Sequence, residues 1–262
     1  MDDLAELAAF ARELAEAARA ETLTRWIRGC PVDNKGGGAF DPVTDADREA
    51  ERVMRQLISE RYPEHGVTGE EWPDSPGLSS YCWSLDPIDG TRSFICGLPT
   101  WTTLIAVMKD DRPLLGLVDA PVLDEIYVGF SEQAVMLRKG EQAAIQVSSC
   151  TRIAEARLST TDPFLFDDAA AEAFGRLRQK VVTVRFGHDG YAYARVAAGS
   201  LDLVVESGLK PHDYRPIIPL VEAAGGVVGD WRGGKDFTSG RIIAAATRPL
   251  FEEALHYFES VE

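Results

Sequence analysis

The sequence predicts an α/β protein, of the α+β kind, in which helices pack around two layers of β-sheet. Three observations support this fold class. Two amphipathic helical segments open the chain, short β-rich segments joined by tight turns follow, and strands alternate with helices from about residue 150. We therefore expect an N-terminal α+β subdomain over residues 1–145 and a C-terminal α/β subdomain over residues 146–262.

The first helix is predicted by the spacing of its apolar residues. Leucine and alanine recur at helical intervals from Leu4 to Ala18, so a helix is expected from about residue 3 to residue 28. Gly29 and Pro31 are helix-breaking residues, and they end the pattern.

The second helix is predicted by a capping pattern. Thr44 has the character of an N-cap residue, and Asp47 stands three residues later, as in a capping box. The apolar face then runs from Ala46 to Ile58, and the helix is expected to stop before Pro63. The preceding segment DNKGGGAF is expected to be a loop.

The middle of the chain has the pattern of successive β-strands. Short β-rich runs are separated by turns that contain glycine, proline or paired aspartates. Because parallel neighbours need long crossover connections, these short turns favour a mainly antiparallel sheet. The predicted strands lie in YCWSLD, WTTLIAVMKD, RPLLGLVDAPV, EIYVGF, AVMLRKG and IQVSS.

The C-terminal part of the chain mixes strands and helices. Helices are expected over residues 167–180, in YAYARVAAG, over residues 214–224 and at the C-terminus. Gly225 and Gly226 close the third of these. Strands are expected in RLSTT, VVTVRFG, LDLVVES, GVVGDW and RIIAAA.

The composition excludes several classes of partner. Lys plus Arg is 27 and Asp plus Glu is 42, so the net charge of 27 − 42 = −15 disfavours binding to nucleic acid and to anionic lipid. The first segment does not resemble a signal peptide, and no apolar stretch approaches the length of a membrane span. Four cysteines without a C-x-x-C pair are typical of a reduced, cytoplasmic protein.

Acidic residues mark a candidate metal site. Asp86 and Asp89 stand at the end of a predicted strand in WSLDPIDGTRSF, Glu70 lies in GVTGEEW, and Asp213 lies in LKPHDY. Hard oxygen ligands from several loops are what Mg²⁺ requires. Two divalent ions roughly 3.5–4 Å apart can hold the attacking and leaving oxygens of a phosphoryl displacement. A lone acid would otherwise be a solvated loop residue or a helix cap.

The turn that follows these aspartates suits a phosphate. Gly90 and Thr91 offer backbone N–H groups at the start of a short helix, where an anion is stabilised. Asp86 is the natural bridging ligand, with Asp89 one short turn away. We therefore expect the aspartates to hold metal and the turn to hold phosphate.

Four segments together resemble the inositol monophosphatase superfamily of Mg²⁺-dependent, lithium-sensitive phosphatases. DPIDGTRSF is similar to the Asp-Pro-Ile/Leu-Asp-Gly-Thr motif of that superfamily. The other three occur in the superfamily's order along the chain, and they are DPVTDADREAE, HGVTGEE and HDYRPIIPLVEAAGG. The resemblance implies a layered αβαβα sandwich of the inositol monophosphatase or sugar phosphatase type, with two to three Mg²⁺ ions in each site.

The resemblance also implies a role for each matching residue. The metal ligands would be Glu70, Asp86, the carbonyl oxygen of Ile88, Asp89 and Asp213. The catalytic residues would be Asp47, Thr91 and Glu70, and the phosphate would be bound by Gly90 and Thr91. Threonine cannot itself act as a base, but Thr91 hydrogen-bonded to Asp47 can hold and deprotonate a metal-acidified water.

Within the superfamily the sequence looks most like the histidinol-phosphatase branch. DLVVESGLKPHDY and GLPTWTTLIAV carry this likeness. His212 replaces the tryptophan that usually precedes the last metal ligand, and we expect it to pack rather than to bind Mg²⁺, which prefers oxygen. The leaving-group pocket would be lined by Arg185, Asp189 and Glu206, next to Asp213.

The predicted function is Mg²⁺-dependent hydrolysis of histidinol phosphate to histidinol and phosphate, a reaction of histidine biosynthesis. Inositol phosphates and 3′-phosphoadenosine-type nucleotides are alternative substrates. A non-catalytic metal-binding or phosphate-binding module is the alternative of a different class, although such a module would not need the water-activating pair Asp47 and Thr91. Members of the superfamily are commonly homodimers, so a homodimer is expected, with no nucleic-acid or membrane partner.

Overall fold

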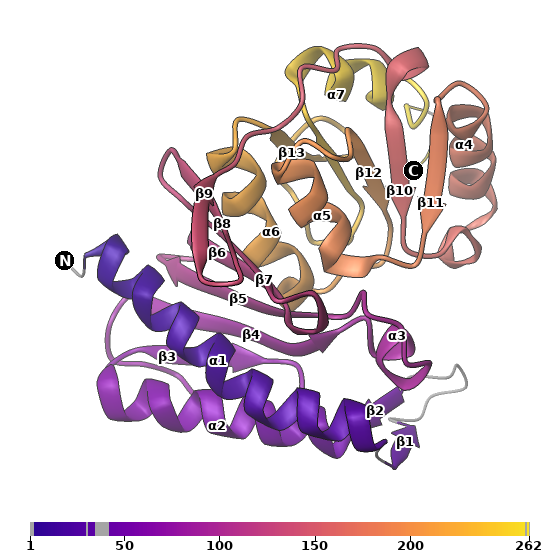
Figure 1. Ribbon diagram of the computed structural model, residues 1–262. Helices are drawn as coiled ribbons and strands as arrows, with labels where there is room; N and C mark the ends of the chain where they lie inside the picture. Colours follow the sequence, from indigo (N-terminus) through magenta and orange to yellow (C-terminus); the bar gives the residue numbers. More distant parts are fainter. Residues whose placement is uncertain (1–2, 30, 35–41, 260, 262) are drawn as a thin grey trace.

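The computed structural model describes residues 3–29, 31–34, 42–259 and 261, and these form five layers (Figure 1). Two helices cover one side of a seven-stranded sheet, two more separate it from a five-stranded sheet, and two cover the far side of the latter. The αβαβα prediction is therefore confirmed. The helices, in the order of the layers, are α1 Leu4–Arg28, α2 Asp45–Arg61, α5 Asp189–Ala197, α6 Pro211–Ala223, α4 Asp168–Arg178 and α7 Arg248–Leu255.

The seven-stranded sheet follows the order of the sequence from β3 to β9. Every neighbouring pair is antiparallel except β3 and β4, which are parallel, so the prediction of a mainly antiparallel sheet is confirmed. Strand β3 is not among the strands that the sequence predicts. The strands are β3 Gly66–Gly69, β4 Tyr81–Asp89, β5 Thr102–Lys109, β6 Arg112–Ala120, β7 Glu125–Phe130, β8 Gln133–Arg138 and β9 Glu141–Ala144.

The last strand of this sheet lies earlier than predicted. Lys139 and Gly140 both have positive φ, 51° and 78°, which suits the tight turn that joins β8 to β9. Strand β9 therefore begins directly at Glu141, and the segment IQVSS is not a strand. The N–H of Val147 instead donates to the carbonyl oxygen of Ala224, as the chain leaves the sheet.

The five-stranded sheet has the order β11-β10-β12-β14-β13 and mixed pairing. Strand β10 is parallel to β11 and to β12, and the other pairs are antiparallel. The predicted subdomain boundary near residue 145 falls between the two sheets, and the division into subdomains stays a prediction. The strands are β10 Arg157–Thr160, β11 Thr183–Phe186, β12 Leu203–Glu206, β13 Val227–Asp230 and β14 Ile242–Ala245.

Short elements join these layers. The helix α3, Thr91–Ile95, follows the Asp-Gly turn as expected, and the short strands β1 and β2 pair ahead of α2. Asp33 and Asn34 of the predicted loop DNKGGGAF belong to β1, so the loop prediction was wrong for them, and residues 35–40 lie outside the described residues. The remaining short elements are β1 Val32–Asn34, β2 Pro42–Thr44 and the 3₁₀ turns η1 Pro121–Leu123, η2 Ile153–Glu155 and η3 Pro163–Leu165.

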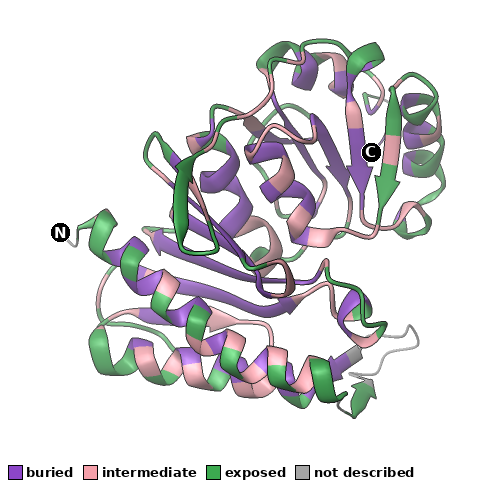
Figure 2. Cartoon of the chain, viewed as in Figure 1, coloured by how far each residue is buried: buried purple, intermediate pink, exposed green. Residues whose placement is uncertain are grey.

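The apolar side chains of the seven-stranded sheet alternate between two cores, one on each face of the sheet. Leu85, Ile105 and Leu117 face α1 and α2, whereas Leu104 and Val118 face α5 and α6. Figure 2 shows the central strands of both sheets buried between their helical layers, whereas the edge strands β9 and β11 are exposed. A β-strand sends successive side chains to opposite faces, so each face belongs to a different core.

Two glycines let α6 lie directly on the seven-stranded sheet. A Cβ atom at Gly116 would come within 1.8 Å of the carbonyl oxygen of Pro216, and one at Gly129 within 2.4 Å of the Cα of Leu220. Because any side chain at these positions would displace the helix backbone, the two glycines fix the position of α6. The N-terminus of α6 carries His212 and Asp213.

Candidate active site

Strand β4 brings two aspartates to the same face of the sheet. Asp86 pairs with Leu104 and Asp89 pairs with Thr102, so between these pairs two residues of β4 stand opposite one residue of β5. In a regular strand, residues three apart would point to opposite faces. The irregularity over Pro87 and Ile88 therefore allows both carboxylates to face the α5–α6 layer.

These aspartates belong to a cluster of possible metal ligands. One carboxylate oxygen from each of Asp86, Asp89 and Asp213 lies within 4.8 Å of the others. Glu70, Asp86 and His212 form a second such group, so Asp86 is common to both. The structure thus brings together the four predicted acidic ligands from β4, from α6 and from the turn after β3.

The turn that carries Glu70 is anchored by a buried acid that the sequence analysis missed. Glu51 of α2 is fully buried, and its carboxylate accepts from the backbone N–H of Glu71 at 2.8 Å and from Arg55 at 2.7 Å. A Cβ atom at Gly69 would overlap the Glu51 carboxylate, at 2.2 Å. Glu51 lies one helical turn after Asp47, on the buried face of α2, and this spacing could have revealed it.

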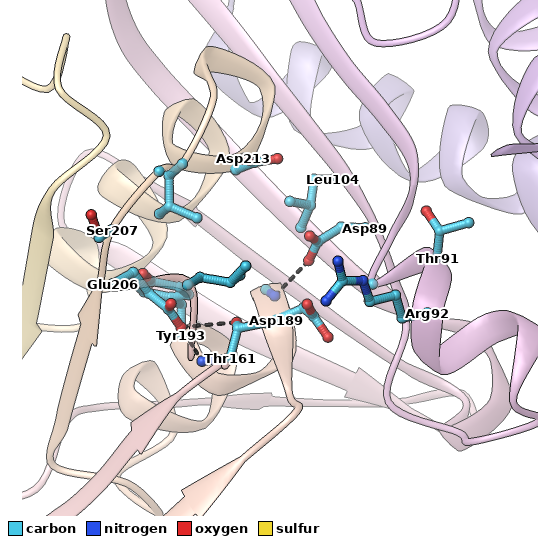
Figure 3. A pocket seen from close by; sticks show the side chains of 15 residues that line it. Asp89, Thr91, Arg92, Leu104, Thr161, Asp189, Tyr193, Glu206, Ser207 and Asp213 are labelled. Carbon is cyan, nitrogen blue, oxygen red and sulfur yellow. Dashed lines mark hydrogen bonds between the residues drawn. The ribbon is translucent and has the colours of Figure 1, made fainter. Parts of the chain in front are cut away.

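Asp89 is held by groups from both halves of the chain. Its Oδ2 atom accepts from the Thr102 hydroxyl at 3.1 Å and from the backbone N–H of Gly190, a bond that Figure 3 marks with a dashed line. A Cβ atom at Gly190 would lie 2.5 Å from the same oxygen, so only glycine permits this approach. The N-terminus of α5 is thereby fixed against β4.

The phosphate turn has the expected backbone, but the hydrogen bonds around it differ from the prediction. Gly90 has φ +82°, a left-handed conformation that favours glycine, and it forms the N-cap of α3. The Thr91 hydroxyl donates to the carbonyl oxygen of Ile88 at 3.1 Å. The Asp47 carboxylate accepts from the backbone N–H and the hydroxyl of Thr44, at 2.8 and 2.6 Å. These bonds replace the expected one between Thr91 and Asp47.

Burial and like charges raise the pKa of the clustered acids. Burial raises the pKa of Asp86 well above its ordinary value, and the negative charges of Glu70 and Asp89 add to the effect. Burial likewise raises the pKa of Asp89. The pKa of Asp47 is raised to about 6, chiefly by burial, although hydrogen bonds from Thr44 oppose the change. A bound cation would relieve this repulsion.

A cavity of about 280 Å³ opens beside the cluster, between the two halves of the molecule (Figure 3). The phosphate turn and Asp89 form one side of it, and Asp189, Tyr193 and Glu206 form the other. A Cβ atom at Gly90 would lie 2.8 Å from the Asp189 carboxylate, so the two sides approach closely.

Two carboxylates on the far side of the cavity were predicted. Burial raises the pKa of Asp189 to about 6, and burial raises that of Glu206 to about 8. Glu206 accepts from the backbone N–H of Thr161 at 2.6 Å and from its hydroxyl at 2.9 Å. Arg185 of β11 is exposed and does not line this cavity, so its contact with substrate stays a prediction.

Two other cavity residues were not foreseen. The hydroxyl of Tyr193 is buried and has no hydrogen-bond partner among the described residues. Tyr193 lies four residues after Asp189 on α5, so the helical spacing alone would place both on one face. Arg92 lines the cavity from α3, and its Nη1 lies 3.6 Å from the Asp162 carboxylate.

Sequence comparison identifies the family. A sequence profile described as "Inositol monophosphatase family" matches residues 3–262. The chain belongs to this family. Enzymes of the inositol monophosphatase family are phosphatases that use divalent metals, and the chain shares this reaction class.

Among its relatives, the chain is similar to the bifunctional phosphatase IMPL2, chloroplastic, of Arabidopsis thaliana, with 38% identity over 98% of this chain and 76% of the relative. It is also similar to the histidinol-phosphatase of Chlorobaculum parvum, with 33% identity over 92% of each chain. The solved structure of an inositol monophosphatase from Zymomonas mobilis superposes with a TM-score of 0.85 and 36% identity, over 99% of this chain and 100% of that one.

The donor set of this inositol monophosphatase family member fits a divalent metal. Asp86 is 2% exposed, and the carboxylates around it have like charges, an arrangement that is unfavourable without a cation. The carboxylates can approach one another because the bulge in β4 and the glycine contacts of α6 fix their backbones. None of the described helices is long and apolar enough to cross a membrane.

Proposed function

We propose that this phosphatase hydrolyses histidinol phosphate to histidinol and phosphate, as a step of histidine biosynthesis. The observation that supports this proposal is the pair of carboxylates on the cavity wall opposite the phosphate turn, half-buried Asp189 and buried Glu206. Histidinol carries an ammonium and an imidazole that can be cationic, and carboxylates make charge-assisted hydrogen bonds to such groups. The similarity to a curated histidinol-phosphatase supports the same substrate.

The metal ions would be held by residues that lie close together in the structure. Glu70, Asp86, Asp89, Asp213 and the Ile88 carbonyl oxygen would hold two to three Mg²⁺ ions, as the sequence resemblance implies. Bound Mg²⁺ would supply an acidified water and would neutralise charge on the phosphate.

The other residues of the site act on the water and the phosphate. In this proposal Asp47 accepts the proton of the attacking water, Thr91 orients that water, and Glu70 assists both. The backbone N–H groups of Gly90 and Thr91 bind the phosphate at the start of α3. Asp189 and Glu206 receive the leaving group on the opposite wall.

The test is a phosphate-release assay over a small panel of monoesters with Mg²⁺ present. The panel contains histidinol phosphate, an inositol phosphate, glycerol phosphate and a 3′-phosphoadenosine nucleotide. Histidinol phosphate is expected to have the highest kcat/KM, and Li⁺ is expected to inhibit. Absence of phosphate release from every monoester would favour the non-catalytic binding module.

Asp189→Ala tests directly whether this wall of the cavity binds a cationic leaving group. We expect KM for histidinol phosphate to rise by the equivalent of about 1.5–3 kcal/mol, the range for a hydrogen bond to a charged group. The matched control is Asp168→Ala, which removes an exposed acid from the first turn of α4 and should leave KM unchanged. Equal losses on histidinol phosphate and glycerol phosphate would leave only a general monoester phosphatase.

Inositol phosphate is the second candidate substrate. It is favoured by the superposition on an inositol monophosphatase at 36% identity. The hydroxyls of inositol are neutral, so they would not need a second carboxylate opposite the phosphate turn. For this substrate, Asp189→Ala should therefore change KM much less than for histidinol phosphate.

We also propose a homodimer in a reduced compartment such as the cytoplasm. Apolar side chains are exposed near the cavity mouth, where Phe164 is 92% exposed and Leu165 is 55% exposed. Large exposed apolar side chains are typical of protein contact surfaces. Cys82, Cys96 and Cys150 are free thiols, as expected in a reducing environment. Light scattering with Phe164→Asp tests the dimer, since this variant should become monomeric.

A further inference from the structure

His212 contributes a nitrogen to the group of possible metal ligands. One of its ring nitrogens lies within 4.8 Å of a carboxylate oxygen of Glu70 and of Asp86. The side chain is 19% exposed, so it lies largely within the protein. The sequence favoured a packing role for this residue because Mg²⁺ prefers oxygen ligands. The structure instead places its ring beside two carboxylates.

The backbone of His212 is fixed from two directions. His212 follows Pro211 at the start of α6, and this helix rests on Gly116 and Gly129 of the seven-stranded sheet. Arg215, one turn later, donates to the Thr68 hydroxyl at 3.1 Å. Thr68 lies on β3, directly before the turn that carries Glu70. The helix start and the Glu70 turn are therefore joined, which keeps the imidazole close to the carboxylates.

The competing contacts of this imidazole are weak. Its Nε2 atom lies 3.5 Å from Asp213 Oδ1, which is long for a hydrogen bond. The three other described histidines are placed differently. Nδ1 of His65 accepts from the indole of Trp83 at 3.1 Å, Nδ1 of His188 lies 3.3 Å from the Ser159 hydroxyl, and His256 is exposed. Only His212 among the described histidines belongs to a possible metal-binding group.

We propose that His212 is a metal ligand and that the Glu70–Asp86–His212 site selects a first-row transition ion, such as Zn²⁺ or Cu²⁺, over Mg²⁺. Imidazole suits Zn²⁺ and its neighbours in the first transition row, whereas Mg²⁺ is bound by oxygen. The remaining group, Asp86, Asp89 and Asp213, offers only oxygen atoms and suits Mg²⁺. This inference rests on the metal-binding part of the proposed function, and it is independent of the substrate.

The first experiment detects the nitrogen directly. Cu²⁺, at less than one equivalent, is added to the substrate-free protein, and electron spin-echo modulation is recorded for ¹⁴N coupled to the ion. Wild type and His256→Gln should show ¹⁴N modulation, and His212→Gln should lose it. No ¹⁴N modulation in wild type with Cu²⁺ bound, or modulation that persists in His212→Gln, would overturn the inference.

The second experiment compares metal affinities by calorimetry. His212→Gln should weaken Zn²⁺ binding by about tenfold or more, because one of few ligands is lost, while Mg²⁺ affinity should change by less than about threefold. His256→Gln controls for binding of Zn²⁺ to exposed histidines. Equal losses of Zn²⁺ and Mg²⁺ affinity would show that His212 supports the shape of the site and does not bind the ion.

Two controls distinguish loss of the metal ligand from misfolding and from failure of the proposed function. Circular dichroism checks that His212→Gln is folded. If His212→Gln does not fold, His212→Trp, which restores the usual family residue, replaces it in both experiments. His212→Trp should also lose the ¹⁴N modulation. Neither experiment uses substrate, so a failed histidinol phosphate assay would overturn the proposed function alone.

Discussion

Asp86 and Asp119 are buried on opposite faces of the same sheet, and their surroundings differ. Asp119 of β6 is fully buried and is held by Arg19 of α1, whose Nε and Nη2 donate to it at 2.9 and 2.6 Å. Asp86 of β4 is 2% exposed and accepts one backbone N–H, from Ile88, at 3.1 Å. Its charged neighbours in the metal cluster are carboxylates. Arg19 therefore gives Asp119 a cationic partner within the fold, although burial still raises the pKa of Asp119 to about 7. Asp86 needs a cation from outside.

The strand register explains how one sheet keeps these environments apart. Asp86 pairs with Leu104, and Leu104 pairs with Val118 on β6. Asp119 is the next residue after Val118, so it points to the other face, toward α1. Burial alone would lower the pKa of the Arg19 guanidinium, but hydrogen bonds and charge attraction from Asp119 outweigh burial and raise it. The face toward α1 is structural, and the face toward α6 is functional.

Asp86→Asn should have the largest effect on activity. A neutral amide is a poor ligand for divalent ions, so we expect kcat to fall by at least about 100-fold in the phosphate-release assay. The metal-free variant should be more stable than metal-free wild type by about 1 kcal/mol, because one of several repelling carboxylates is removed. Urea unfolding in the presence of a chelator measures this change. Retention of more than about a tenth of kcat would contradict a metal role for Asp86.

Asp119→Asn should have the opposite pattern. It leaves the guanidinium of Arg19 buried without its main partner, so the free energy of unfolding should fall by about 3 kcal/mol. Because Asp119 faces away from the cavity, kcat of the folded fraction should stay near the wild-type value. Urea unfolding and the phosphate-release assay measure both quantities. A stable but inactive Asp119→Asn protein would remove the distinction between the two faces.

The sequence predicts the functional face better than the structural one. The carboxylates of LDPIDGT stand next to a glycine turn, and this local pattern has a chemical meaning by itself. The pair Arg19 and Asp119 joins residues 100 apart, and no local spacing relates them. Helices and antiparallel strands were predictable because their periods are local. Strand β9 was misplaced because its start depends on the turn at Gly140.

The stability of the metal-free protein should depend on pH. Burial raises the pKa of Asp47 and of Asp189 to about 6, and that of Glu206 to about 8. A raised carboxyl pKa means that the folded state binds more protons than the unfolded state, so stability falls as pH rises through these values. We expect the free energy of unfolding to fall by about 6 kcal/mol from about pH 5 to about pH 8 in a chelator, with more than half of the fall due to Glu206.

Saturating Mg²⁺ should reduce this dependence without abolishing it, because the ion compensates the ionised carboxylates of the cluster but not Glu206 on the opposite wall. Urea unfolding at several pH values, with chelator and with Mg²⁺, measures both curves. Stability of the metal-free protein that rises with pH over this range would contradict the raised pKa values. Identical curves with and without Mg²⁺ would contradict a metal site at these carboxylates.

Tyr193→Phe should have the smallest effect among these variants. It tests whether a neutral hydroxyl on the functional face also acts on substrate and not on stability. The buried hydroxyl of Tyr193 lacks a hydrogen-bond partner among the described residues, so its removal should not lower stability. If the hydroxyl binds substrate in the cavity, KM should rise by the equivalent of about 1 kcal/mol.

The matched control is Tyr127→Phe, since the Tyr127 hydroxyl donates to Glu125 at 2.6 Å and lies outside the cavity. Tyr127→Phe should lower the free energy of unfolding by about 1 kcal/mol and leave KM unchanged. Thermal unfolding and KM for both variants check this, and a Tyr193→Phe variant that loses stability without a change in KM would make Tyr193 a structural residue.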